Sequence, residues 1–150
     1  MSDEPGNGVA VLLIDDNPGD VRLTREALKE TGRSTDLSVV NDGVEALRFL
    51  RREGPYSNAP RPSLILLDLN LPKSDGRQVL AEIKTDDDLK MIPVVVMTSS
   101  DSQHDIRSAY SLHANCYITK PVDLDQLFSI LRVWLVRAHE SSSATLTVAG

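Results

Sequence analysis

The chain has 150 residues, 41% hydrophobic and 25% charged, a composition typical of one soluble globular domain. Its single cysteine, Cys116, excludes a disulfide framework and a cysteine-rich metal site. The formal net charge of −6 argues against nucleic acid as the main partner, because phosphate binding needs a clustered basic surface. The polar first residues do not resemble a secretory signal and no apolar run reaches membrane-spanning length, so we expect a cytoplasmic protein without membrane contact.

The first predicted unit is a strand followed by a helix. Val9–Ile14 is a continuous apolar run rich in β-branched residues, which predicts a strand covered on both faces. Asn17 suits a helix N-cap, and Pro18 suits the first helical position. We expect this helix to end near Thr31, because Gly32 stands where a C-terminal cap would lie.

The second predicted unit is shorter and is followed by a long connection. Leu37–Val40 predicts a strand, and Asp42 suits the N-cap of a helix over Gly43–Arg52. One face of that helix is expected to carry Val44, Leu47 and Leu50. Three prolines and a glycine in Glu53–Pro62 predict a loop.

Three more units follow in the same alternation. Their strands are predicted at Leu64–Leu67, Val94–Met97 and Cys116–Thr119, ending at Asp68, Thr98 and Lys120. Their helices are predicted after the capping residue Asp75, at Gln103–Leu112 and at Leu124–Arg137. The last helix has the clearest apolar stripe of the chain, formed by Leu124, Leu127, Phe128, Leu131, Trp134 and Leu135.

Five successive strand–helix units predict an α/β fold with a doubly wound, five-stranded parallel sheet. Helices would cover both faces of this sheet. We assign residues 9–137 to one domain, because residues 1–8 and 138–150 lack a clear apolar period and read as flexible tails. In folds of this kind the functional site lies beyond the carboxyl ends of the strands.

Polar side chains follow four of the five predicted strands: Asp15 and Asp16, Asp68, Thr98, and Lys120. Three like charges at one sheet edge repel each other, and a divalent cation resolves that conflict. Hard oxygen ligands suit Mg²⁺, and neutralisation of part of the charge leaves one carboxylate free to act as a nucleophile. A lysine and a threonine hydroxyl can then stabilise a transferred phosphoryl group, so the pattern indicates a phosphoryl-transfer site.

Four motifs occur in order: IDDNPGD at Ile14–Asp20, LLDLNLPKSDG at Leu66–Gly76, VVVMTSS at Val94–Ser100 and YITKP at Tyr117–Pro121. Together they resemble the receiver domain of two-component response regulators. Thr98 and Lys120 lie 30 and 52 residues after Asp68, the separations of chemotaxis-type receivers. The first motif and the proline-rich segment before the third strand look more like the phytochrome-associated single-domain regulators. The resemblance runs from about Val9 to Arg137.

The resemblance implies the flavodoxin-like (βα)5 receiver fold and a role for each matching residue. Asp68 would be the phosphoacceptor. Mg²⁺ would be held by Asp15, Asp16 and Asp68, and by Asn70 through its backbone carbonyl. Lys120 and Thr98 would stabilise the phosphoryl group, and Tyr117 would be the aromatic residue that turns inward. The Lys120–Pro121 peptide bond is expected to be cis.

By the same resemblance, the chain is a single-domain response regulator and not an enzyme. A histidine kinase would phosphorylate it, and the likeness to phytochrome-associated regulators points to a kinase of the phytochrome type. Its output would be contact with a downstream protein, a phosphorelay partner or a second copy of itself. We expect the surface that changes to comprise the fourth helix, fifth strand and fifth helix, including Ile106, Tyr110, Tyr117 and Val133.

Three other classes of function compete with this one. A phosphohydrolase of the haloacid dehalogenase type would need a second Asp as general acid where this chain has Asn70. A phosphate-independent scaffold would usually lack one of the acidic residues, and none is missing here. A flavin site is weaker still, because the acidic first loop would repel a phosphate.

Overall fold

The structure is a computed structural model that describes residues 8–71, 75–99, 107, 110–111 and 113–149, with side chains to residue 137. Its strands are β1 Val9–Ile14, β2 Thr35–Val40, β3 Leu64–Asp68, β4 Val94–Thr98 and β5 Cys116–Thr119. Its helices are α1 Pro18–Glu30, α2 Gly43–Leu50, the 3-10 turn η1 Gly54–Tyr56, α3 Gly76–Thr85 and α5 Leu124–Ala149.

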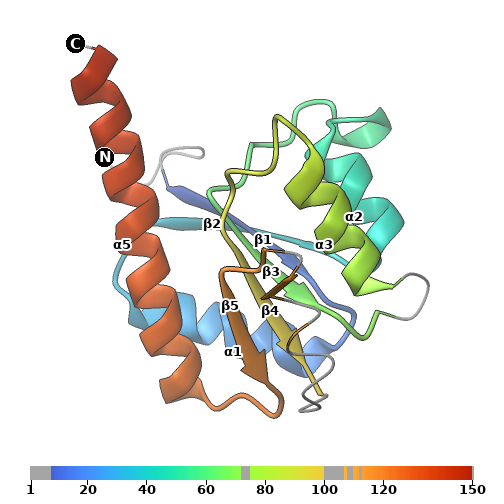
Figure 1. Ribbon diagram of the computed structural model, residues 1–150. Helices are drawn as coiled ribbons and strands as arrows, with labels where there is room; N and C mark the ends of the chain where they lie inside the picture. The colour runs from blue at the N-terminus through green and yellow to red at the C-terminus, as the bar shows by residue number, and fades with distance from the viewer. Residues whose placement is uncertain (1–7, 72–74, 100–106, 108–109, 112, 150) are drawn as a thin grey trace.

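The five strands form one parallel sheet in the order β2-β1-β3-β4-β5. Helices α2 and α3 lie on one face of this sheet, and α1 and α5 lie on the other (Figure 1). The chain order of the strands departs from their spatial order next to β1, which is a switch point of the doubly wound kind. The predicted five-stranded α/β fold is therefore confirmed.

Apolar side chains form a separate cluster on each face of the sheet. Alternate residues of β1 point to opposite faces, so Leu12 and Ile14 join the cluster under α2 and α3, and Val11 and Leu13 join the cluster under α1 and α5. All residues of β3 and β4 are buried. The central strands are therefore held from both sides, which fixes the position of the residues at their carboxyl ends.

The predicted helix starts are confirmed by their caps. The Asn17 side chain accepts hydrogen bonds from the backbone N–H groups of Gly19 and Asp20, at 2.8 and 3.3 Å. The Asp42 and Asp75 side chains cap α2 and α3 in the same way. Gly32 follows the end of α1 with a φ of +70°, a left-handed conformation that glycine adopts without strain.

Several predicted boundaries and faces were wrong. Strand β2 begins two residues earlier, because Thr35 and Asp36 extend the pairing along β1. Val44 is 59% exposed and lies off the buried face of α2, which consists of Gly43, Ala46, Phe49 and Leu50. The predicted loop over Glu53–Pro62 contains the turn η1, whose Tyr56 ring packs against Phe49 with 5.4 Å between ring centroids.

Helix α5 carries the predicted stripe but runs further than predicted. Leu127, Leu131 and Leu135 are buried, in the cluster shared with α1. The backbone remains helical to Ala149 instead of ending near Arg137, because no proline follows Pro121 and no glycine lies between Gly76 and Gly150. Trp134 is partly buried on this helix, with the Arg137 guanidinium 5.2 Å from its ring centroid.

The helix predicted over Gln103–Leu112 falls mostly outside the described residues, and Ile106 lies among those not described. Within the described part of the chain, no helix combines the length and the apolar character needed to cross a membrane.

Candidate functional site

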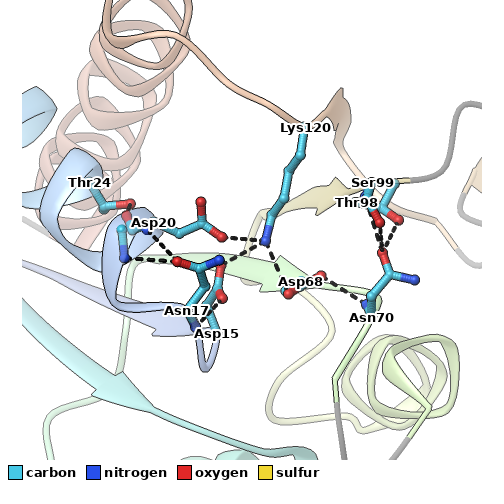
Figure 2. A network of polar contacts seen from close by, with 10 residues as sticks. Asp15, Asn17, Asp20, Thr24, Asp68, Asn70, Thr98, Ser99 and Lys120 are labelled. Carbon is cyan, nitrogen blue, oxygen red and sulfur yellow. Dashed lines mark hydrogen bonds and ion pairs between the residues drawn. The ribbon is translucent and has the colours of Figure 1, made fainter.

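The polar residues predicted at the strand ends meet at the carboxyl edge of the sheet (Figure 2). Asp15 follows β1, Asp68 ends β3, Thr98 ends β4 and Lys120 follows β5. Asp15, Asp68 and Thr98 are each at most 4% exposed. Side chains that are distant in sequence are thus held together by rigid, buried strands.

Asp15, Asp16 and Asp68 form a three-carboxylate cluster. One oxygen from each lies within 4.8 Å of the others, a grouping that can hold a metal ion. Asp15 and Asp68 are buried, whereas Asp16 is exposed to solvent. The donor set consists of carboxylate oxygens, which suits Mg²⁺ and similar hard cations.

Backbone N–H groups hold the two buried carboxylates in place. The N–H of Asn17 donates to Asp15 Oδ1 at 2.9 Å, and the N–H of Asn70 donates to Asp68 Oδ1 at 2.8 Å. In both cases the donor lies two residues further along the chain, in the turn that leaves the strand. The other oxygen of each carboxylate, Oδ2, contacts Lys120.

Burial raises the pKa of Asp15 to about 7, because the charged form loses water. The hydrogen bond from the backbone of Asn17 and the positive charge of Lys120 oppose this rise, and the carboxyls of Asp20 and Asp68 add to it. A cation bound by the three-carboxylate cluster would stabilise the charged form of Asp15 and so offset the cost of burying it. The site therefore favours binding of a positive charge.

Lys120 is the positive centre of the site. Its Nζ lies 3.2 Å from Asp15 Oδ2 and 3.1 Å from Asp68 Oδ2, and it makes a third, short contact with Asp20. Burial is the largest single influence on the pKa of Lys120 and acts to lower it, but the hydrogen bonds to Asp20 and Asp68 and the charges of Asp15 and Asp68 together outweigh it. The pKa is therefore raised above its ordinary value and the lysine stays charged.

Asn70 connects Asp68 with the end of β4. Its side-chain oxygen accepts hydrogen bonds from the Thr98 hydroxyl at 2.6 Å and from the backbone N–H of Ser99 at 3.1 Å. The Thr98 carbonyl in turn accepts a hydrogen bond from the Lys120 backbone N–H at 2.7 Å. The ends of β3, β4 and β5 are therefore linked next to the three-carboxylate cluster.

Gly76 allows helix α3 to start against the backbone that follows Asp68. A Cβ atom at this position would lie 2.5 Å from Leu69 Cα and 2.8 Å from the carbonyl oxygen of Asp68. Both neighbours are backbone atoms and cannot rotate away. Only glycine fits without a shift of the segment that carries Asp68.

The structure also places the remaining predicted residues. The Lys120–Pro121 bond is cis, as predicted. Tyr117 is partly buried, with its ring centroid 6.4 Å from that of Tyr110. Asp20 was missed by the sequence reading. The available signal was its place in the first turn of α1, one helical turn after Asp16, which brings it to the same edge of the sheet.

Residues 11–132 match the response regulator receiver domain family. The match covers most of the chain, and the strand order and strand-end carboxylates agree with it. The chain therefore belongs to the response regulator receiver domains, which are signalling proteins of two-component systems and bind a divalent metal ion. Membership implies a histidine kinase as partner.

Similar proteins include phytochrome-associated regulators. The response regulator Rcp1 of Synechocystis is 50% identical over 132 residues, which are 88% of this chain and 90% of Rcp1. The crystal structure of the phosphorylated cyanobacterial phytochrome response regulator RcpA matches with a TM-score of 0.77 and 53% identity, over 84% of this chain and 90% of that one. The Mn²⁺-bound form of Rcp1 matches with a TM-score of 0.75 and 50% identity, over 83% of this chain and 89% of that one.

Proposed function

We propose that Asp68 accepts a phosphoryl group from a phosphohistidine of a histidine kinase. The observation that carries this assignment is the pairing of Asp68 with Lys120 at 3.1 Å, beside Asp15 and Asp16. In the transfer, the bond from phosphorus to the histidine nitrogen breaks as a bond to an Asp68 carboxylate oxygen forms. A proton takes the place of the phosphoryl group on the imidazole.

Asp15, Asp16 and Asp68 would hold Mg²⁺ through their carboxylates, and Asn70 through its backbone carbonyl. Bound Mg²⁺ would neutralise part of the negative charge that develops on the phosphoryl oxygens. Lys120 contributes a positive charge from the side of β5. The Thr98 hydroxyl, which donates a hydrogen bond to Asn70 in this structure, would donate it to a phosphoryl oxygen instead.

The test is phosphorylation by a small phosphodonor such as acetyl phosphate, followed by intact mass. Wild-type protein with Mg²⁺ should gain one phosphoryl group, and Asp68→Asn should gain none. Asp88→Asn, which removes an exposed carboxylate outside the site, is the matched control and should be labelled as wild type. Labelling of Asp68→Asn to the wild-type level would refute the assignment.

The output surface is proposed to be the fourth helix, β5 and α5. Support comes from the contact between the Tyr110 and Tyr117 rings, which joins an exposed residue to the strand that precedes Lys120. Val133 is 52% exposed on α5 and would be part of the proposed surface. Movement of Thr98 toward the phosphoryl group would let Tyr117 turn inward and change what the surface presents.

Hydrogen exchange before and after phosphorylation tests this surface. We expect changed protection between Thr98 and Arg137. Changes confined to α1, with none in that range, would refute the output proposal and leave the phosphoacceptor assignment untouched. Sedimentation of the phosphorylated protein distinguishes a second copy of the chain from a different downstream protein or a relay partner.

We further propose that residues 9–137 act in the cytoplasm as a single-domain regulator with no enzymatic output and no nucleic-acid partner. The similarity to RcpA, a cyanobacterial phytochrome response regulator, supports a phytochrome-type histidine kinase as the phosphodonor. Phosphoryl transfer from a panel of phosphorylated kinases tests this partner.

The asparagine at position 70 supports a regulator over a phosphohydrolase, because its amide is bonded to Thr98 and carries no titratable proton.

A further inference from the structure

The Lys120 ammonium has three N–H donors, and three carboxylates surround it. Asp15 and Asp68 lie at 3.2 and 3.1 Å, and Asp20 makes the third contact. In this arrangement every donor of Lys120 has an acidic partner. A phosphoryl group on Asp68 can receive a hydrogen bond from Lys120 only if one of these contacts weakens.

Asp20 differs from the other two carboxylates in its role. Asp68 is the proposed phosphoacceptor and Asp15 a proposed metal ligand, whereas Asp20 has neither task. We propose that Asp20 is a positioning residue that competes with the phosphoryl group for the Lys120 ammonium. It thereby stabilises the unphosphorylated arrangement of the site. This inference rests on the proposed function.

The start of α1 is built to present Asp20 at this place. Its backbone N–H donates to the Asn17 cap at 3.3 Å, and its carbonyl accepts from the Thr24 hydroxyl at 2.8 Å. Thr24 is 1% exposed, so the first turn of α1 is anchored in the protein interior. The side chain of Asp20 is thus held against the site rather than free in solvent.

The contact between Lys120 and Asp20 is also partly shielded from solvent. The side chains of Lys120 and Asp20 are 15% and 23% exposed, in contrast to 49% and 93% for the surface pair of Lys90 and Asp87. Exposed ion pairs contribute little to stability, whereas shielded, charge-assisted hydrogen bonds contribute more. Loss of the Asp20 carboxylate should therefore measurably strengthen the interaction of Lys120 with a phosphoryl group.

A different role for Asp20 would be structural. A carboxylate in the first turn of a helix stabilises the helix through its dipole, whatever lies beyond it. That role predicts a less stable protein with unchanged affinity for a phosphoryl group. The positioning role predicts a higher affinity, because the competitor for Lys120 is gone.

Binding of beryllofluoride with Mg²⁺, which imitates a phosphoryl group on a carboxylate, separates the two roles. Asp20→Asn keeps the shape and removes the charge, and it should bind beryllofluoride about tenfold more tightly than wild type, the effect expected for one shielded ionic hydrogen bond. Glu26→Gln removes an exposed carboxylate from the same helix and should leave the affinity unchanged.

The stability of the metal-free protein gives a second readout. Asp20→Asn, Lys120→Met and the double variant are compared by urea unfolding. A direct contact predicts that the two single effects do not add. Additive effects, or an Asp20→Asn affinity for beryllofluoride equal to or below that of wild type, would overturn the proposal.

Two further outcomes are decisive. If Asp20→Asn does not fold, Asp20→Ser replaces it, and failure of both to fold would refute the positioning role by making Asp20 a structural residue. If wild-type protein does not bind beryllofluoride with Mg²⁺, the proposed function fails and this inference fails with it. If wild-type protein binds beryllofluoride but Asp20→Asn does not bind it more tightly, the inference fails and the proposed function stands.

Discussion

The affinity for Mg²⁺ should depend on pH because of Asp15. Its carboxyl is fully buried, and its pKa is raised to about 7, chiefly by that burial. A carboxyl must lose its proton before it can bind a metal ion, so Mg²⁺ and a proton compete for Asp15. Each bound Mg²⁺ should displace a proton over the pH range in which Asp15 is still protonated.

The size of the effect follows from that pKa. A group with a pKa of about 7 is roughly 10% ionised at pH 6 and roughly 90% ionised at pH 8. The apparent association constant for Mg²⁺ should therefore rise about tenfold between these pH values. Titration calorimetry in buffers of different ionisation enthalpy measures both the affinity and the released proton.

Asp15→Asn is the control, since it removes the titrating group and should flatten the pH dependence while lowering the affinity. An affinity of wild-type protein that is equal at pH 6 and pH 8, without proton release, would refute the reasoning.

The same shift predicts how the stability of the metal-free protein changes with pH. The pKa of Asp15 is about 7 in the folded state and about 3.8 in the unfolded chain. Between these values the folded protein keeps a proton that the unfolded chain has lost. The contribution of Asp15 to stability therefore decreases as pH rises from about 4 to about 7 and stays low above that range. Urea unfolding at pH 5 and pH 8, with and without Mg²⁺, measures the effect.

Three substitutions and one control substitution test the architecture of the site and the core. Gly76→Ala should lower the free energy of unfolding by about 1–3 kcal/mol and slow phosphorylation, because the new Cβ would collide with backbone atoms. Gly19→Ala is the control. A Cβ atom there would have a side-chain oxygen at 3.1 Å as its nearest neighbour, so the stability and the phosphorylation rate should change less. Asp68→Ala should raise the metal-free melting temperature by a few degrees through relief of carboxylate repulsion, and a lower value would contradict the crowded cluster. Leu131→Ala, at a position with 0% exposure, should lower the free energy of unfolding by about 2–5 kcal/mol, measured by urea unfolding.

The strand ends could be predicted because several physical signals agree there. A continuous apolar run marks a strand buried on both faces, and the first acidic residue after it marks the sheet edge. Asp15 and Asp68 both follow such runs, so the site could be located from the sequence alone. The N-caps of three helices could be predicted for a similar reason, because each capping residue precedes an amphipathic segment. These residues are Asn17, Asp42 and Asp75.

The wrong predictions share a physical cause, which is tertiary context. Val44 fits the helical period as well as Phe49 does, but Phe49 lies in the apolar cluster between the sheet and α3, whereas Val44 is exposed. Asp20 reads as an ordinary first-turn carboxylate until Lys120, 100 residues later, is placed against it. Contacts between residues so far apart leave no trace in local sequence patterns.

Trp134 provides an optical probe that needs no chemical labelling. It is the single tryptophan of the chain, and its ring is partly buried on α5 beneath the Arg137 guanidinium. Emission selected for tryptophan therefore comes from one known place in the molecule, on a different element from the three-carboxylate cluster. Stopped-flow fluorescence of the unmodified protein could consequently time the arrival of a structural change at α5 and compare it with the rate of phosphoryl transfer.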